Sequence, residues 1–127
     1  MITLQQLTKA LHQAWDSDTA YDATEWSSNN KARGQCVVSS LLVQDYLGGE
    51  LVRYEINEGS LHEMHYANQL EDGTIVDTTG SQYLSPVSMK IKPVALKGFA
   101  SIRDKRLADT STARRYEILK KRVEQLL

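Results

Sequence analysis

Apolar residues recur at helical spacing at the start of the chain. They stand three or four positions apart, at Leu4, Leu7, Leu11 and Trp15. This spacing predicts an amphipathic helix, and Thr3 followed by Gln6 resembles a capping box at its start. Residues 16–34 are polar and show no periodicity, so they predict a long loop of a kind that often carries function. Trp26 is the expected apolar anchor of this loop.

The next apolar run predicts a second helix, from about Gln35 to Leu47. Its apolar face is formed by Val38, Leu41, Leu42 and Tyr46. Gly48 and Gly49 end this helix, because glycine readily adopts the left-handed conformation found at helix C-termini. Residues 50–56, with the sequence ELVRYEI, then alternate between apolar and polar side chains, as a half-buried strand does.

Further strands are expected in the second half of the chain. Residues 65–70 and 74–79 predict two strands joined by the sequence Glu-Asp-Gly, which is a hairpin signal. The apolar segment 87–96 predicts a short strand, which Pro93 confines to the edge of the sheet because proline has no N–H to donate.

A last helix is expected to begin near Ser111 or Thr112. Its core-facing residues are Tyr116, Leu119, Val123 and Leu126. The order of helices and strands indicates a single α+β domain spanning residues 1–127. We expect N-terminal helices, one of them at the Cys36 end, to pack on an antiparallel sheet, with a C-terminal helix completing the domain.

The composition is that of a globular protein, with 41% hydrophobic and 24% charged residues among 127. A single cysteine rules out an intrachain disulfide, and the first residues lack the pattern of a secretory signal peptide. No segment approaches the roughly 18 consecutive apolar residues that a membrane span needs. These features predict a cytoplasmic protein that does not contact the membrane.

The net charge of −1 hides a division along the chain. Residues 1–89 carry 4 Lys and Arg against 12 Asp and Glu, whereas residues 90–127 carry 11 against 4. The favoured interpretation is a basic C-terminal element folded back on an acidic body, rather than a tail for an anionic partner. No nucleic-acid-binding motif accompanies the basic helix, and no glycine-rich phosphate loop is present. We therefore expect neither a nucleic-acid partner nor a cofactor.

The single cysteine, Cys36, follows Gly34-Gln35 at the start of the second predicted helix. A helix N-terminus favours a thiolate, because its unpaired N–H groups and aligned peptide dipoles stabilise negative charge. Cys36 is therefore a candidate nucleophile. The alternative is a small buried apolar residue, since free cysteine is often buried and Val37 and Val38 follow it.

His65 is the candidate base for this thiol, and Asp77 is the candidate group that orients its imidazole. Their placement depends on the hairpin. A two-residue turn pairs Asn68 with Asp77 and sends His65 to the opposite face of the sheet. A three-residue loop with Gly73 left-handed pairs Ala67 with Asp77, and His65 and Asp77 then share a face. A catalytic triad requires the second arrangement.

The order of a thiol on a helix, then a histidine and a carboxylate on neighbouring strands, occurs in many cysteine peptidases and amidases. The chain also resembles the YunG-like family of small bacterial proteins, over roughly residues 26–127. The matching residues are Gly34-Gln35-Cys36, Gln44-Asp45, Gly48-Gly49, His65-Tyr66, Asn68, Val76-Asp77, Thr79, Arg115-Tyr116 and Arg122-Val123. The chain departs from that pattern at Ala67, where the family usually has a large aromatic residue.

The arrangement that this resemblance implies is similar to that of papain-like and NlpC-like thiol hydrolases. The leading hypothesis is a small cysteine hydrolase or acyl-transfer enzyme that acts on an amide or ester, including one in a protein or peptide. Cys36 is its nucleophile, His65 its general base and acid, and Asp77 the orienting group. The alternative is a non-catalytic binding module on the same core, using the 16–34 loop to recognise a partner.

A thiol hydrolase also needs donors for the oxyanion, namely the Cys36 backbone N–H and a side-chain amide. The amides of Asn29, Asn30, Gln35 and Asn68 are candidates, although a structural hydrogen bond is the favoured interpretation of Asn68, and Trp26 is a candidate for substrate binding. His62 is the reserve base. No metal is expected, because on a strand His62 and His65 point to opposite faces and no zinc-binding pattern is present.

Overall fold

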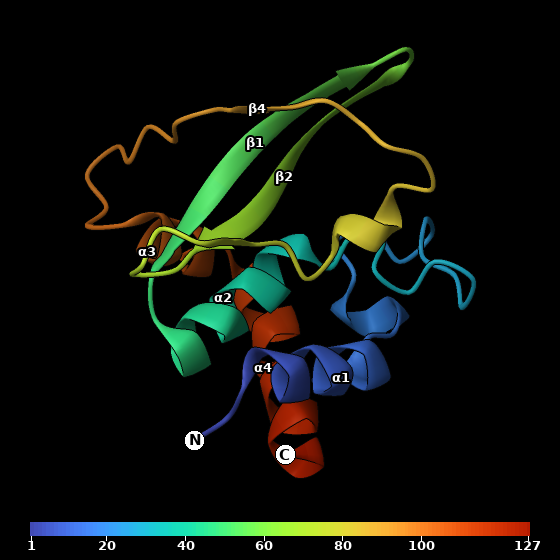
Figure 1. The fold of residues 1–127 in the computed structure, drawn as a ribbon, viewed down its shortest axis with the longest axis vertical. Coiled ribbons are helices and arrows are strands. Elements are labelled where there is room, and N and C mark those ends of the chain that lie inside the picture. Colours follow the sequence, from blue (N-terminus) through green and yellow to red (C-terminus); the bar gives the residue numbers. More distant parts are fainter.

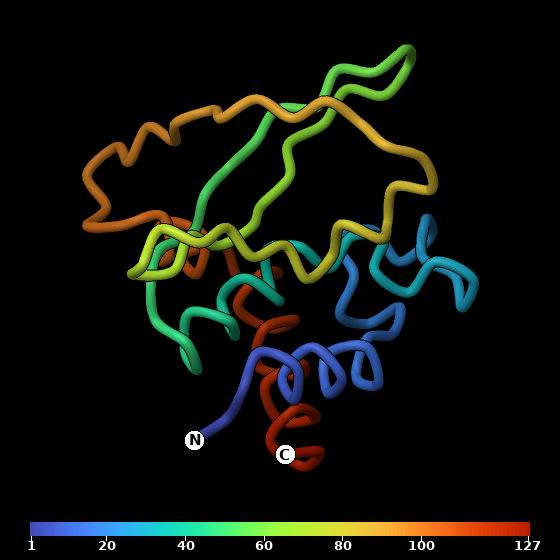
Figure 2. The backbone as a smooth tube through the Cα atoms, in the orientation of Figure 1, coloured from blue at the N-terminus to red at the C-terminus, as the bar shows by residue number.

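The computed structural model describes residues 1–127 and has α+β architecture (Figure 1). Its elements in chain order are α1 (Leu4–Ala14), η1 (Ser17–Thr19), α2 (Cys36–Leu47), β1 (Glu50–Glu58), β2 (Leu61–Gln69), β3 (Ile75–Val76), η2 (Gly80–Gln82), β4 (Met89–Ile91), α3 (Ile102–Leu107) and α4 (Thr110–Leu126). In the view of Figures 1 and 2, α1 and α4 form one end of the molecule and the β1–β2 hairpin extends to the other. None of the helices combines the length and the apolar composition needed to cross a membrane.

The first helix forms as its sequence predicts. The Thr3 side chain accepts a hydrogen bond from the Gln6 N–H, and the Gln6 side chain accepts one from the Thr3 N–H. The predicted capping box is therefore confirmed. Leu7 and Leu11 are fully buried, whereas Leu4 lies at the exposed end of the same face.

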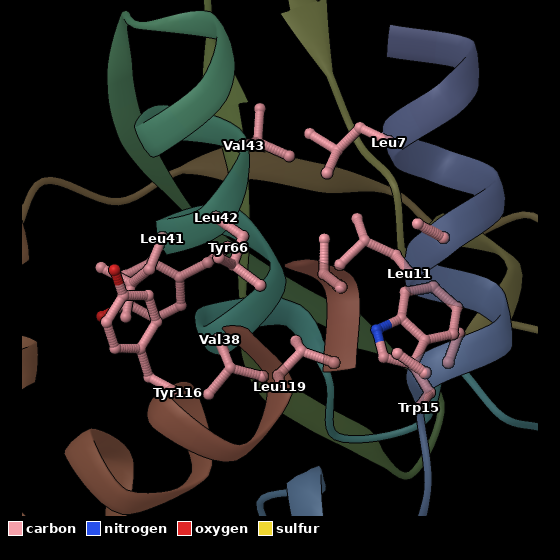
Figure 3. Packing of buried hydrophobic residues seen from close by; sticks show 14 of the residues in the cluster. Leu7, Leu11, Trp15, Val38, Leu41, Leu42, Val43, Tyr66, Tyr116 and Leu119 are labelled. Carbon is pink, nitrogen blue, oxygen red and sulfur yellow. The ribbon is translucent and has the colours of Figure 1, made fainter. Parts of the chain in front are cut away.

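Helix α2 is the centre of the fold. Residues 38–43 are all buried, because β2 packs on one side of the helix and α1 and α4 pack on others. Figure 3 shows Val38 and Leu42 of α2 facing Leu119 of α4 and Leu11 of α1. The polar groups of this buried helix have partners, since the Trp15 indole N–H donates to the Ser39 hydroxyl at 2.9 Å.

The sheet has four antiparallel strands in the order β3-β2-β1-β4. Strands β1 and β2 form a long hairpin in which Tyr54 lies opposite His65. The short strand β4 occupies the edge beside β1 and ends two residues before Pro93, as expected from the missing N–H of proline.

The β2–β3 connection has the three-residue loop that places His65 and Asp77 on one face. The Leu70 N–H donates to the Thr74 carbonyl at 2.8 Å, and Gly73 has the left-handed φ of 90° that this loop requires. Asn68 pairs with Val76, so the same register sets Asp77 level with Ala67. Strand β3 itself is short, and Asp77 lies just beyond its end.

Two segments differ from the sequence-based expectation. Helix α3 was not predicted, because its six residues are too few to show a helical period. The 16–34 segment contains the short helix η1, and its most buried apolar residues are Ala20 and Ala32 rather than Trp26, which is half-buried. Small side chains are favoured there because the segment passes close to the residues before α2.

The basic C-terminal segment folds back on the acidic body, as the charge division predicts. Helix α4 packs against α1 and α2 and begins at Thr110, one residue earlier than expected, with Asp109 as its cap. Arg122 of α4 forms an ion pair with Asp18, and Arg103 of α3 forms one with Asp45 at 2.8 Å.

We predict that Gly49→Ala destabilises the protein by about 3 kcal/mol or more, because two costs add. Gly49 has a φ of 79°, and an added Cβ would overlap the Gln69 carbonyl oxygen and lie 2.8 Å from the Leu70 Cα. Gly59→Ala is the matched control, since its φ is 57° but its Cβ would meet no atom within 4 Å.

Gly59→Ala is expected to cost only about 1–2 kcal/mol, from the backbone conformation alone. Urea unfolding of both variants measures the difference. Equal losses would show that the close approach of Gly49 to the end of β2 does not constrain the fold.

Candidate active site

The segment before α2 presents Cys36 as the first residue of the helix, half-buried. Gly34, with a φ of 78°, accepts a hydrogen bond from the Tyr21 N–H at 2.8 Å. A Cβ at Gly34 would lie 3.0 Å from that same nitrogen, so only glycine fits without a shift. Gln35 is fully buried and donates to the Asp16 carbonyl at 3.1 Å. These contacts fix the position of the thiol relative to the 16–34 segment.

His65 lies on β2 with no exposed surface, and its Nε2 is 2.8 Å from the Oδ2 of Asp77. The other carboxylate oxygen of Asp77 accepts from the Thr79 N–H at 3.2 Å, which orients the carboxylate. Burial alone would lower the pKa of His65, but hydrogen bonds and charge interactions with Asp77 and Cys36 outweigh it and raise the pKa to about 9. His65 is therefore an imidazolium at neutral pH.

The second ring nitrogen of His65, Nδ1, faces two further side chains. The Tyr83 hydroxyl is 3.3 Å from it and the Gln82 amide nitrogen is 3.4 Å from it. The Tyr83 hydroxyl also donates to Glu63 at 2.7 Å, and burial together with this bond raises the pKa of Tyr83. Since Nε2 is engaged by Asp77, Nδ1 is the nitrogen available to Cys36.

A second ion pair supports this side of the site. Both terminal nitrogens of Arg33 donate to Glu63 at 2.8 Å, and Arg33 also pairs with Glu25 at 2.9 Å. Burial opposes ionisation of Glu63, yet hydrogen bonds from Arg33 and Tyr83 hold its pKa below the usual value. Glu63 is therefore a fixed anion that positions the Tyr83 hydroxyl against His65.

A cavity of about 420 Å³ opens beside the thiol and is lined by residues from seven parts of the fold: the 16–34 segment, α2, β1, β2, η2, α3 and α4. Cys36, Glu63 and Gln82 are among its lining residues. His65 and Asp77 do not line it, so the imidazole lies behind the thiol as seen from the cavity. This places the Cys36 thiol at a surface that a small molecule or a side chain can reach, while the His65 imidazole is shielded from water.

Two of the predicted amide donors are engaged in structural hydrogen bonds. The Gln35 amide donates to the Asp16 carbonyl, away from the cavity. Asn68 is buried and donates to the Ser40 carbonyl of α2 at 2.9 Å, which agrees with its structural interpretation. Both side chains attach α2 to its surroundings.

The other two predicted binding residues also lie outside the cavity lining. The Asn30 amide donates to the Gln82 carbonyl at 2.9 Å, and the Trp26 indole donates to the Lys31 carbonyl at 3.0 Å. Asn29 is exposed. These contacts hold the 16–34 segment in shape and join it to η2.

Gln82 is the amide that sequence reasoning missed. It is 5% exposed, lines the cavity and directs its amide nitrogen at His65. It lies in the short helix η2, within a stretch that shows no hydrophobic period, so no pattern in the sequence singles it out. Only the folding of this stretch over β2 brings Gln82 to the site.

His62 does not take part in this cluster. Its Nδ1 is 2.6 Å from the Asn57 side-chain oxygen near the exposed tip of the hairpin. No group of three or more histidine, cysteine or acidic side chains is arranged to hold a metal ion. His65 is thus the histidine that the fold brings to Cys36.

The fold and this cluster define a small α+β protein with a cysteine, a histidine and an aspartate gathered beside a cavity. The model of the YunG protein family matches residues 3–127, and the chain belongs to that family. It is similar to the uncharacterized protein YunG of Bacillus subtilis (strain 168), with 24% identity over 90 residues that cover 71% of each chain. No solved structure matches the chain.

We predict that the free energy of unfolding depends on pH through His65. Its pKa is about 9 in the folded protein and about 6.5 in an unfolded chain, so the folded state holds the proton more tightly. The resulting stabilisation, up to about 3 kcal/mol, is complete below pH 6.5 and is lost as the pH rises through 9.

Asp77→Asn should lower the pKa of His65 and flatten this dependence. NMR titration of the imidazole and urea unfolding between pH 6 and 10 measure both effects. His12→Gln is the control, because burial lowers the pKa of His12, so that His12 is already neutral where His65 loses its proton. An unchanged slope in Asp77→Asn would contradict the predicted linkage.

Proposed function

We propose that the protein is a small cysteine hydrolase or acyl-transfer enzyme that acts on an amide or ester. Cys36 is the nucleophile, His65 the general base and acid, and Asp77 the group that orients His65. The observation that carries this proposal is the placement of His65, which bonds to Asp77 through Nε2 and interacts with Cys36 at the cavity.

In the first half of the reaction, the Cys36 thiolate attacks the carbonyl carbon of the substrate and a C–S bond forms. The carbonyl electrons move to oxygen, giving a tetrahedral oxyanion. As this intermediate collapses, His65 donates its Nδ1 proton to the leaving nitrogen or oxygen, and the bond from carbon to that atom breaks. An amine or alcohol leaves, and Cys36 remains as a thioester.

In the second half, neutral His65 removes a proton from water, or from another acceptor in acyl transfer. The resulting nucleophile attacks the thioester carbon, and the C–S bond breaks with its electron pair on sulfur. This step restores the thiolate and the imidazolium. The Asp77 carboxylate stabilises the positive charge of His65 in every state in which the imidazole is protonated.

Two donors are suited to the oxyanion. The Cys36 backbone N–H lies at the start of a helix, where it has no acceptor within the helix. The Gln82 amide nitrogen lies 3.4 Å from Nδ1 of His65, which is itself a donor in the imidazolium, and its one protein acceptor, the Thr79 hydroxyl, is 3.5 Å away. Gln82 therefore supplies the side-chain donor in this proposal, in place of the amides engaged elsewhere.

A papain-like or NlpC-like core remains part of this proposal. A helix that begins with the nucleophile, followed by a strand histidine and a carboxylate on the next strand, is the arrangement that this class of thiol hydrolases uses. The localisation expected from the sequence, the cytoplasm, suits an enzyme whose single thiol must stay reduced.

We predict that iodoacetamide alkylates Cys36 of the folded protein at pH 6.5 faster than it alkylates glutathione, because the proposed pair with His65 makes the thiol more nucleophilic. His65→Gln should slow alkylation at pH 6.5 by about 10-fold or more, because the imidazolium that stabilises the thiolate is lost. Mass spectrometry of the alkylated protein measures both rates. His62→Gln is the matched control and should react as the unaltered protein does.

Turnover is tested with p-nitrophenyl acetate, an activated ester. One equivalent of p-nitrophenolate should appear in a burst, with an acetyl group on Cys36, and Cys36→Ser should abolish the burst. If Cys36 reacts with neither reagent until the protein unfolds, the catalytic proposal is wrong. A binding module that keeps the same core would then be the better interpretation.

A further inference from the structure

Two arginines on the wall of the cavity lack carboxylate partners. Arg106 comes from α3 and Arg115 from α4, and both line the cavity beside Cys36. Neither forms a salt bridge with any acidic residue of the chain. Most other arginines near the cavity are engaged, as Arg33 is by Glu25 and Glu63.

Arg115 is buried and Arg106 is half-buried, which makes the missing carboxylate partners unusual. Arg115 is only 5% exposed, and its one hydrogen bond to a side chain is to the Thr112 hydroxyl, at 3.2 Å. The Nε atoms of both arginines are buried without a hydrogen-bond partner, so a bound anion would meet the terminal nitrogens of the two groups. A positive charge without a carboxylate partner in such surroundings costs free energy that a bound anion would recover.

The nearest carboxylate does not fill this role. Asp109 attracts both arginines, but one of its oxygens caps α4 by accepting from the Thr112 N–H at 2.9 Å and from the Thr112 hydroxyl at 2.7 Å. Burial lowers the pKa of Arg115, and the positive charge of Arg106 lowers it further. The two guanidinium groups are thus close enough to repel each other.

The donor geometry of the two guanidinium groups indicates which anion the cavity accepts. Its three acidic lining residues and the Cys36 thiolate of the proposed function together match the charge of its four arginines, so hydrogen-bond donors and not surplus charge select the anion. A carboxylate presents two oxygens in a plane, which matches the donors of a guanidinium group. Two tyrosines, Tyr21 and Tyr66, lie under the guanidinium groups and hold them in place.

We infer that the substrate carries a carboxylate group that Arg106 and Arg115 bind in the cavity, close to the carbonyl that Cys36 attacks. The position of the reacting carbonyl in this inference rests on the proposed function, in which Cys36 is the nucleophile. The carboxylate site itself depends only on the two arginines. The substrate class is therefore an amide or ester of an acidic compound, including a peptide with a free carboxylate near the cleaved bond.

Two alkylating reagents of nearly equal size test this inference. Iodoacetate carries a carboxylate and iodoacetamide a neutral amide, and with both the thiolate attacks the methylene carbon while iodide leaves with the C–I electron pair. The measured quantity is the ratio of the two rate constants, iodoacetate over iodoacetamide, at pH 7. Glutathione provides the ratio for a free thiol without a binding site.

The ratio for Cys36 should exceed that for glutathione by about 10-fold or more. Arg115→Met keeps most of the aliphatic volume and should lower the ratio at least about 5-fold, whereas Arg115→Lys should keep part of it. Arg106→Met should act in the same direction and serves if Arg115→Met does not fold. Arg114→Met is the matched control, because Arg114 is exposed on α4 outside the cavity and the ratio should not change.

A second measurement does not need the thiol. In Cys36→Ser, sodium acetate should shift the NMR signals of the Arg106 and Arg115 Nε–H groups in a saturable way, and acetamide should not. If the iodoacetate-to-iodoacetamide ratio of Cys36 equals that of glutathione and the arginine signals do not shift, the carboxylate site is wrong. The hydrolase proposal still stands in that case if iodoacetamide reacts rapidly with Cys36. A thiol inert to both reagents, with saturable acetate shifts, overturns the hydrolase proposal and keeps the carboxylate site.

Discussion

The buried pair of His65 and Asp77 is the interaction on which the site depends. An imidazolium without exposed surface is stable only if its charge and both N–H groups have partners. Asp77 provides the charge and one acceptor at 2.8 Å, and the Nδ1 side is closed by Tyr83 and Cys36. Removing Asp77 would leave the charge of the buried His65 without its partner, so this contact favours the β2–β3 register that the three-residue loop also sets.

The second constraint is the burial of α2. Residues 38–43 of this helix are buried, and two hydrogen bonds join its buried serines to neighbouring elements. The Ser39 hydroxyl accepts from the Trp15 indole at the end of α1, and the Ser40 backbone carbonyl accepts from Asn68 of β2. These bonds fix the rotation of the helix about its axis as well as its position. The start of the helix, and with it Cys36, is thereby aimed at the strand that carries His65.

Much of this could be predicted from the sequence because local patterns encode it. The capping box of α1, the glycine stop of α2 and the alternation in β1 each depend on residues a few positions apart. Whether His65 and Asp77 share a face depends on which of two hairpin loops joins β2 to β3. The left-handed φ of Gly73 shows that the three-residue loop forms. Glycine in the last loop position is consistent with that choice, but the sequence alone permits both.

The parts that could not be predicted come from contacts between distant segments. Gln82 reaches the site because η2 folds over β2, and no periodic pattern marks that stretch. Arg115 matches the YunG-like pattern, but its position in a charged helix does not predict its burial, and it is among the buried polar residues. Trp26 contributes a hydrogen bond to its own loop and is half-buried, whereas the buried apolar residues of the segment are the small Ala20 and Ala32, whose place no apolar pattern predicts.

The layout of the chain also bears on how the protein is made. The thiol, the imidazole and the carboxylate all leave the ribosome before α4, which is synthesised last of the elements. Helix α2 nevertheless cannot be covered until Leu119 and Val123 of α4 dock against it. A nascent chain therefore holds Cys36, His65 and Asp77 without fixing their geometry. Their surroundings are complete only when the helix that also carries Arg115 has been added, so in the proposed function Cys36 becomes reactive only after the whole domain is made.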